Sequence, residues 1–345
     1  MLKKPEKVSF LHLPTPVEYL PRVSEELGIN LYIKRDDLTP YGTGGNKLRK
    51  LEYFMADAIA QGATALVTVG GPQTNHGRLT AAVAAKYGMK CTIVTVGADP
   101  GEVSGNILLD RIMGAEVVVV VPKEGDDEDA LEAQYGEEAM EKYMAAGEKP
   151  YFVPMGGSNE LGTMGYYECA QELDKQVQEM GIENARIIVT TGSLGTYMGL
   201  FMGLKECRSK VKLTGICISP SSDPVPAKRA LGYFKRCKEY FGLDWDAEEA
   251  DFDMVNRYHY GAYNNAVADV RESVYDMGRR EGIILDACYT GKTFNAIRLM
   301  AKNGEIKPGE NIIFIHTGGV PGIWGNIHRI PFEEELKGGV SVIKR

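Results

Sequence analysis

The feature that most constrains the fold is an alternation of short apolar runs with amphipathic stretches along almost the whole chain. Residues 65–69 and 116–121 are β-branched runs of strand length, and residues 46–61 carry apolar side chains at helical spacing. Strands that alternate with helices pair in parallel and are covered on both faces. We therefore predict an α/β fold with mostly parallel twisted sheets, in which ligands bind at the carboxyl ends of the strands.

The same pattern gives the order of the elements. The predicted strands are residues 31–34, 65–69, 91–96, 116–121, 151–153, 187–191, 213–219 and 311–315, of which 116–121 is expected to be fully buried. The predicted helices are residues 46–61, 74–87, 107–113, 127–146, 162–180, 196–206, 227–240, 266–280 and 292–303. A length of 345 residues allows two such domains or one large one.

Charge and cysteine content exclude several classes of function. Lys and Arg number 39 and Asp and Glu number 47, and the resulting net charge of −8 argues against a nucleic-acid partner. The six cysteines lack metal-ligand spacing and only five histidines are present, so we expect no metal site and a cytoplasmic protein with reduced thiols. A charged N-terminus and the lack of a long apolar run predict neither a secretory leader nor a membrane span.

A glycine-rich loop at residues 42–46 leads into Lys47, at the first turn of a predicted helix. The helix dipole disfavours a cation at this end. A lysine amine held close to neutrality can form an imine with a carbonyl group. Considered alone, the loop is explained equally by an ordinary solvated lysine.

Three further glycine-rich loops lie next to predicted strands. Residues 70–76 offer Thr74 as an N-cap and N–H groups for a substrate carboxylate, although His76 fits a structural histidine as well. Residues 191–196 place successive N–H groups at a helix N-terminus, which suits a single phosphate. Residues 316–319 follow the last strand, and no motif for a dinucleotide or a nucleoside triphosphate occurs.

Five segments, in this order along the chain, give the loops a common explanation. They are IKRDDLT at 33–39, GGNKLRKLE at 44–52, GGSN at 156–159, DACYTGK at 286–292 and FIHTGG at 314–319. Together they resemble the pyridoxal-phosphate (PLP) enzymes that include D-cysteine desulfhydrase and 1-aminocyclopropane-1-carboxylate (ACC) deaminase, which have the tryptophan synthase β-like fold. The resemblance extends from about residue 13 to residue 324.

The resemblance implies two α/β domains with PLP in the cleft between them. We expect residues 1–49 and 160–345 to form the larger domain and residues 50–159 the smaller inserted one. It also implies a homodimer, with a small amino acid as substrate.

Site residues follow from the matching motifs. Lys47 matches the lysine that carries PLP, and with Tyr289, Tyr263 and Thr74 it forms the expected catalytic set. The expected cofactor-binding residues are Lys47, Asn75, Gly192, Ser193, Leu194, Gly195, Thr196, Thr290 and Thr317. The expected substrate-binding residues are Thr74, Asn75, His76, Gly157, Tyr263 and Tyr289.

The implied activity is β-elimination, with D-cysteine giving pyruvate, sulfide and ammonia. Thr290 occupies the position that faces the pyridine nitrogen, where ACC deaminases carry Glu and the desulfhydrases Thr. A neutral partner weakens the electron sink, which suits β-elimination better than opening a cyclopropane. Thr74 stands where the family usually has Ser, and Trp324 where a smaller group is expected, so ACC and other β-substituted alanines such as cysteate stay open as substrates.

A hypothesis of a different class is a non-catalytic α/β protein that binds a small anion or an amino acid. It explains the glycine-rich loops and the fold. It does not explain Lys47 within its motif, or the pair of Tyr263 and Tyr289.

Overall fold

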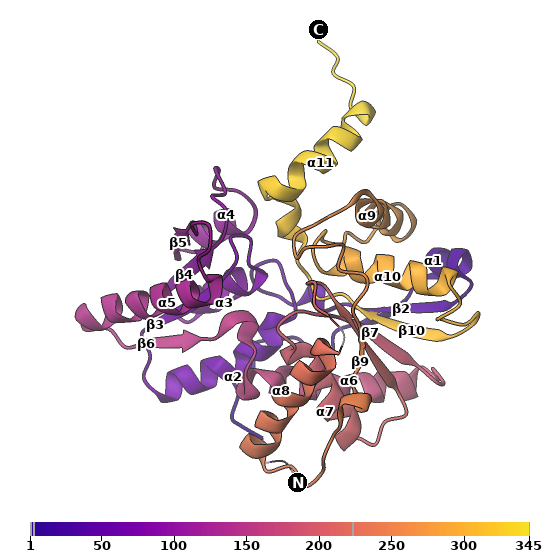
Figure 1. Ribbon diagram of the computed structural model, residues 1–345, viewed down its shortest axis with the longest axis horizontal. Coiled ribbons are helices and arrows are strands. Elements are labelled where there is room, and N and C mark those ends of the chain that lie inside the picture. Colours follow the sequence, from indigo (N-terminus) through magenta and orange to yellow (C-terminus); the bar gives the residue numbers. More distant parts are fainter. Residues whose placement is uncertain (1, 3, 223, 345) are drawn as a thin grey trace.

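The strands form two sheets in the computed structural model, which describes residues 2, 4–222 and 224–344 (Figure 1). The larger sheet has six strands in the order β1-β2-β10-β7-β8-β9, and the smaller has four in the order β5-β4-β3-β6. Neighbouring strands are parallel except β1 and β2, which are antiparallel. The predicted α/β fold with mostly parallel sheets is confirmed.

Most elements lie within one or two residues of the predicted bounds. The strands are β1 (Val17–Tyr19), β2 (Asn30–Lys34), β3 (Ala65–Gly70), β4 (Lys90–Val96), β5 (Glu116–Val120), β6 (Pro150–Val153), β7 (Arg186–Thr191), β8 (Lys212–Cys217), β9 (Asp253–Val255) and β10 (Asn311–Ile315). The helices are α1 (Pro21–Leu27), α2 (Lys47–Ala60), α3 (Asn75–Lys86), α4 (Gly105–Ile112), α5 (Glu128–Ala145), α6 (Glu160–Glu179), α7 (Gly195–Glu206), α8 (Val225–Phe241), α9 (Ala268–Glu281), α10 (Thr290–Lys302) and α11 (Asn326–Leu336). Short 3₁₀ helices are η1 (Asp36–Leu38), η2 (Met155–Gly157), η3 (Glu249–Asp251), η4 (Val320–Trp324) and η5 (Lys337–Gly339).

The prediction that residues 116–121 are fully buried is wrong. All five residues of β5 are only partly buried, whereas every residue of β3 is buried. The reason is position: β5 is an edge strand with one neighbour, and α5 packs over β3 and β4 instead. The sequence also gave no sign of β1, α1, β9 and α11, of which three are too short for a clear periodic pattern.

Buried charges hold one side of α2. The Arg49 guanidinium donates to both carboxylate oxygens of Asp36, at 2.8 and 2.9 Å, and to Glu172 of α6 at 3.0 Å. Lys34 also pairs with Glu172, and the Tyr166 hydroxyl donates to Asp36. Burial raises the pKa of the Asp36 carboxyl, but the charge of Arg49 and its hydrogen bonds outweigh this effect and lower the pKa to about 2.

Close backbone contacts fix the position of α2 further. A Cβ atom at Gly165 of α6 would lie 2.4 Å from the carbonyl oxygen of Arg49. A Cβ atom at Gly199 of α7 would lie 2.4 Å from the carbonyl oxygen of Thr163 in α6. Helices that approach so closely have little freedom to move. The contacts with α6, which itself packs against α7, therefore fix the position of α2 and of its first residue, Lys47.

The four-stranded sheet and its helices lie within residues 65–153, and the six-stranded sheet is built from the chain on both sides of that segment. We therefore keep, as a proposal, the boundaries of residues 1–49 and 160–345 for the larger domain and 50–159 for the smaller.

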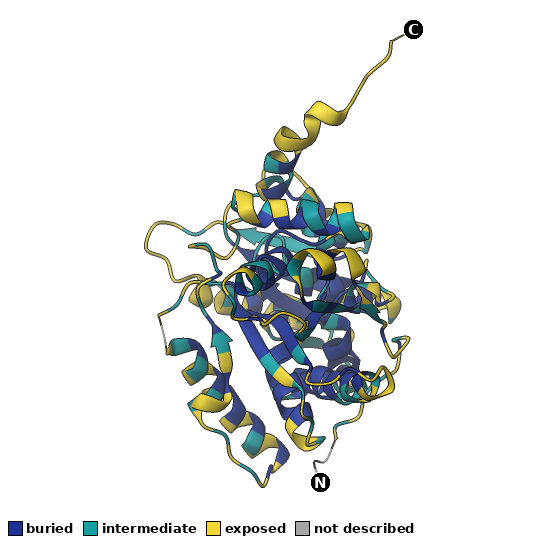
Figure 2. Cartoon of the chain, turned by 90° about the vertical axis from the view of Figure 1, so that its right-hand side faces the viewer, coloured by how far each residue is buried: buried dark blue, intermediate teal, exposed yellow. Residues whose placement is uncertain are grey.

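The C-terminal segment stands away from the rest of the chain. Helix α11 and the residues after it project from the body in both ribbon views (Figures 1 and 2). The large apolar side chains exposed on this segment are Ile327, Ile330, Leu336, Val340, Val342 and Ile343. Among the described residues no helix is long and apolar enough to cross a membrane.

Candidate active site

Three of the predicted loops meet at Asn46, the residue before Lys47. The Asn46 backbone N–H donates to the carbonyl oxygen of Thr317 at 3.0 Å. Its side-chain amide donates to the hydroxyl of Thr196 at 3.0 Å. Thr196, which is 150 positions further along the chain, and Thr317, which is 271 positions further, therefore both contact the loop that carries Lys47.

The loop before Lys47 needs glycine. Gly44 has a φ of +75°, and a Cβ atom there would lie 1.9 Å from the carbonyl oxygen of Asp37. Gly45 forms an isolated antiparallel bridge with Gly318. The Arg78 guanidinium of α3 donates to the Gly42 and Gly44 carbonyl oxygens, at 2.7 and 2.9 Å. The sequence analysis did not identify Arg78, because nothing in the sequence of a helix shows that one of its arginines hydrogen-bonds a distant loop.

Two lysine amines lie together in this region. Burial lowers the pKa of Lys47 to about 8. Lys50, one turn along α2, is completely buried, and burial and the neighbouring charge of Lys47 lower its pKa well below the ordinary value. Neither amine pairs with a carboxylate within the described ranges. The pKa of Lys47 is lowered in the direction expected from the sequence, but the cause is burial and not the helix dipole.

Lys50 forms the floor of the glycine-rich turn at residues 192–196. Its Nζ donates to the Gly156 carbonyl oxygen at 3.0 Å and to the Ser158 hydroxyl at 2.9 Å. A Cβ atom at Gly195 would lie 2.9 Å from that Nζ and 2.6 Å from the Ser158 hydroxyl oxygen. The Ser193 hydroxyl lies 2.8 Å from that of Ser158.

This arrangement suits a small anion. Gly195 is the first residue of α7, and Leu194 before it has a φ of +66°, so the turn brings backbone N–H groups to the helix N-terminus. The predicted residues Gly192, Ser193, Leu194, Gly195 and Thr196 are all in this turn. Lys50 and Ser158 were not predicted, although the spacing of three residues between Lys47 and Lys50 places both on one face of a helix.

The second predicted loop leads into α3. Thr74 is its N-cap, and its hydroxyl accepts a hydrogen bond from the Gly77 N–H at 3.2 Å. The Asn75 side-chain oxygen accepts from Arg78 at 2.9 Å and from Asn106 at 3.0 Å. These bonds fix the Asn75 amide so that its NH₂ group is directed toward Gly319, where a Cβ atom would lie 3.0 Å from it.

His76 and Gly157 lie behind this loop. The His76 ring is buried, and burial, together with the charges of Lys47 and Lys50, lowers its pKa well below the ordinary range. A Cβ atom at Gly157 would lie 3.4 Å from the His76 ring and from the Lys50 stem. Neither residue lines the pocket described below, so the proposal that they bind substrate has less support than the others.

The two predicted tyrosines are neighbours. The rings of Tyr263 and Tyr289 lie 5.6 Å apart at an angle of 85°, an edge-to-face contact. Burial raises the pKa of the Tyr289 hydroxyl, which therefore stays protonated at neutral pH.

Thr290 is tied to a carboxylate that the sequence did not reveal. The Thr290 hydroxyl donates to Asp286 at 2.6 Å and accepts from the Asp286 N–H at 2.9 Å. The Asp286 carboxylate also accepts N–H groups from Cys288, Tyr289 and Thr290, at 2.7 to 2.8 Å. This bonding holds the start of α10 in place and uses both hydrogen-bonding functions of the threonine hydroxyl.

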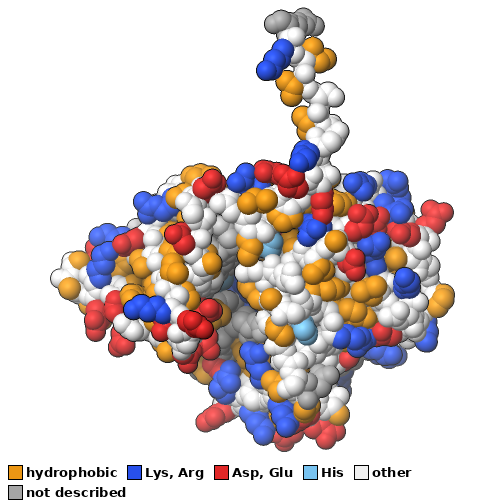
Figure 3. Space-filling model, turned by 45° about the horizontal axis from the view of Figure 1, so that its top comes forward, with side chains coloured by type: hydrophobic (Ala, Val, Ile, Leu, Met, Phe, Trp, Pro, Cys, Tyr) orange, Lys and Arg blue, Asp and Glu red, His pale blue; other side chains and the backbone are white. Residues whose placement is uncertain are grey.

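A small pocket brings several of these elements together. The predicted residues Thr74, Asn75, Tyr263 and Tyr289 line it. The other lining residues are Gly71, Gln73, Asn264, Asp286, Ala287, Cys288, Gly319, Gly322 and His328. A hollow is visible between the two parts of the surface (Figure 3). Lys47, Thr290, Thr317 and the turn at residues 192–196 are not among the lining residues. Gly45, two residues before Lys47, bridges Gly318, which precedes the lining residue Gly319.

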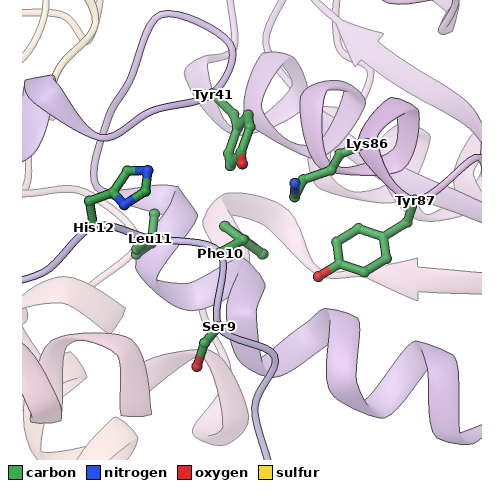
Figure 4. A pocket seen from close by; sticks show the side chains of 7 residues that line it. All are labelled: Ser9, Phe10, Leu11, His12, Tyr41, Lys86 and Tyr87. Atoms are coloured by element: carbon green, nitrogen blue, oxygen red, sulfur yellow. The ribbon is translucent and has the colours of Figure 1, made fainter.

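A second, larger pocket contains none of the predicted residues (Figure 4). It is lined by Ser9, Phe10, Leu11, His12, Tyr41, Lys86 and Tyr87. Its one charged residue, Lys86, is exposed and lies 4.5 Å from the centre of the Tyr41 ring. No group of three or more potential ligands that could hold a metal is found among the described residues.

Known proteins resemble the chain over nearly its whole length. The pattern of the family described as "Pyridoxal-phosphate dependent enzyme" matches residues 8–318. A Pyrococcus abyssi protein named "Putative 1-aminocyclopropane-1-carboxylate deaminase" is 36% identical over 324 residues, which is 94% of each chain. The "D-cysteine desulfhydrase" of Klebsiella pneumoniae is 37% identical over 326 residues, covering 92% of this chain and 95% of the relative.

Solved structures agree with these relatives. A crystal structure of an "ACC deaminase homologue" has a TM-score of 0.83 and 36% identity, and the match covers 98% of this chain and 97% of the other. A fungal L-serine ammonia-lyase from Rhizomucor miehei has a TM-score of 0.66 at 18% identity, with coverages of 95% and 98%, and shares the fold.

Proposed function

Because the chain belongs to the family of pyridoxal-phosphate-dependent enzymes, and is a lyase of the group that contains ACC deaminases and D-cysteine desulfhydrases, we propose that it catalyses β-elimination from D-cysteine. The products are pyruvate, sulfide and ammonia. The choice of substrate rests on the resemblance, which assigns Thr290 rather than a glutamate to the position that faces the pyridine nitrogen. In support, this threonine is fixed at the start of α10, where its hydroxyl donates to Asp286 at 2.6 Å.

The residues fit PLP. Lys47, with its lowered pKa, supplies an amine able to attack the cofactor aldehyde. The turn at residues 192–196, with Lys50 and Ser158 behind it, receives the phosphate, and in that role the buried Lys50 amine gains the anionic partner that the chain itself does not provide. Asn75, fixed by Arg78, is placed to donate to a ring oxygen.

Bound PLP withdraws electrons from the Cα atom of an attached amino acid, and the chain supplies positioning and proton transfer. The N–H groups at the start of α3, beside Thr74, hold the substrate carboxylate. The Lys47 amine, once free, removes the Cα proton as a general base. Tyr289 keeps its proton because of its raised pKa, and supplies it near the leaving group.

The test is a panel of D-cysteine, L-cysteate, β-chloro-D-alanine and ACC, with the enantiomers of the chiral compounds, assayed for pyruvate or 2-oxobutyrate. We expect the highest kcat/KM with D-cysteine. Absence of pyruvate and sulfide from D-cysteine would remove that substrate.

ACC deaminase is the second candidate. Four of the relatives, among them the Pyrococcus abyssi protein, carry that activity in their names, and the solved structure at 36% identity is described as a homologue of it. Release of 2-oxobutyrate from ACC, without turnover of D-cysteine, would favour this candidate.

We further propose a homodimer in the cytoplasm. The exposed apolar side chains of α11 and the residues after it, including Ile327 and Val342, support association with a second copy (Figure 3). No disulfide links the described cysteines, which agrees with a reducing compartment. Light scattering of the full chain beside a chain ending at residue 336 tests the dimer.

A further inference from the structure

His328, in the first turn of α11, reaches the pocket from a part of the chain that no predicted site residue occupies. Its side chain is 4% exposed. The buried Nδ1 atom has no hydrogen-bond partner, and no side-chain hydrogen bond of His328 is found among the described residues. A buried polar atom of this kind costs free energy unless a ligand or water satisfies it.

Several other polar side chains around the pocket have hydrogen-bond partners within the chain. Asp286 accepts four hydrogen bonds, and the Thr74 hydroxyl accepts from Gly77. The Gln73 amide donates to the Ser104 carbonyl oxygen and its oxygen accepts from the Asn106 N–H. His328 is thus a polar group that the fold brings to the pocket without giving it a partner.

Different walls of the pocket are suited to different parts of the substrate. Gly71 and residues 73–75 come from the segment between β3 and α3, and their helix N-terminus suits the carboxylate common to all amino acids. Tyr263, Tyr289 and His328 come from segments that follow residues 50–159, the proposed smaller domain, in the sequence. With the carboxylate at the helix N-terminus, the side that carries Tyr263, Tyr289 and His328 is left for the substituent on Cβ, which differs from one amino acid to the next.

Burial favours the neutral form of the His328 ring. Burial lowers its pKa, and of the two nearby charges Asp286 raises that pKa while Lys292 lowers it. A neutral imidazole has one donor and one acceptor nitrogen. It can hydrogen-bond a thiol, a hydroxyl or a sulfonate, but has nothing to offer a halogen or a methyl group of equal size.

We propose that His328 is a specificity-determining residue that hydrogen-bonds the substituent on Cβ, and so selects amino acids whose leaving group carries a sulfur or oxygen atom able to form a hydrogen bond. This inference rests on the proposed lyase function. It names the chemical class of the leaving group, which the choice of family does not.

The experiment compares His328→Phe and His328→Asn with the unchanged holoenzyme. D-cysteine and β-chloro-D-alanine are assayed side by side, and binding of D-serine and D-alanine is followed by the visible absorption of bound PLP. We expect His328→Phe to lower kcat/KM for D-cysteine and affinity for D-serine roughly tenfold, with changes below about twofold for β-chloro-D-alanine and D-alanine. His328→Asn keeps a donor and an acceptor and recovers part of the loss.

Three results overturn the inference: equal losses for all four compounds, no loss for any, or an unchanged protein that binds none of them. His12→Phe is the matched control, since His12 is exposed in the distant pocket of Figure 4. The proposed function is judged separately. It fails if the unchanged protein takes up no PLP or releases no product, whereas the inference fails on the ratio between paired compounds.

Discussion

Helix α2 carries buried cations on two sides, and the two sides differ in their partners. Arg49 is enclosed by Asp36 and Glu172, so its charge is compensated within the chain. Lys47 and Lys50 have only each other, carbonyl oxygens and hydroxyls. The pKa shifts follow: that of Arg49 is raised well above its ordinary value, and those of both lysines are lowered.

The difference separates structure from function. A buried charge with its partner in place belongs to the fold, because removing one member leaves the other unpaired. Buried amines without a carboxylate are destabilising unless something from outside binds them. One helix thus contains both a compensated ion pair and the two lysines to which we assign, as a proposal, the binding of the PLP carbonyl group and phosphate.

The largest expected effect is at Lys47. Lys47→Ala should lower kcat on the order of 10⁴-fold, because it removes both the covalent attachment of PLP and the base. The measurement is product release, together with borohydride trapping and peptide mapping of the labelled lysine. Lys86→Ala, at an exposed lysine far from the site, should leave both unchanged. Label on a lysine other than 47 would contradict the assignment.

Asp36→Asn should destabilise the chain by about 3–5 kcal/mol, because Arg49 loses its buried partner. Since the folded pKa of Asp36 is about 2, below its unfolded value, the carboxylate stabilises the fold above pH 4 and loses this contribution as the pH falls toward 2. Denaturant unfolding of the apoprotein from pH 2.5 to 7 measures this difference, with Asp244→Asn at an exposed position as control. Parallel stability curves for variant and unchanged protein would show that the pair contributes little.

The contribution of Asp110 of α4 to stability has the opposite pH dependence from that of Asp36. Asp110 is buried, its Oδ1 has no hydrogen-bond partner, and burial raises its pKa to about 7 against the opposing effect of Arg78. Its contribution to stability is complete below the unfolded pKa and is lost as the pH rises through 7. Asp110→Asn should therefore be more stable than the unchanged protein at pH 8, by at most about 4 kcal/mol, and the two should converge near pH 4. A variant that is less stable at pH 8 would indicate that the carboxylate is paired with Arg78 after all.

The smallest effect concerns Lys50. Lys50→Met should raise the Kd for PLP about 10- to 100-fold, since a hydrogen bond to a charged group contributes about 1.5–3 kcal/mol. The apoprotein should not lose stability, because the side chain that is removed is a buried amine without a carboxylate partner. Titration of apoprotein with PLP by absorbance and thermal unfolding without PLP measure the two quantities. Unchanged PLP affinity in Lys50→Met would separate Lys50 from the phosphate turn.

Much of the candidate site was predictable because it consists of short local sequence motifs. The glycine-rich turns, the N-cap at Thr74 and the lysine at the start of α2 are local patterns, and the structure places them next to one another. Lys50, Arg78 and Asp286 were not predicted. Each is an ordinary charged residue by type, and becomes notable only through burial and through partners far away in the sequence.

The sequence alone determined the kind of elements, their order and the loops able to meet a phosphate and an amine-reactive carbonyl, because these depend on spacing over a few residues. Only the tertiary structure decided which charges are compensated and which are left for a ligand. Lys50 meets Ser158 across 108 positions, Asn46 meets Thr196 across 150, and His328 reaches a pocket that begins at Gly71. Such pairings depend on how the two sheets and their helices pack, and no local pattern encodes them.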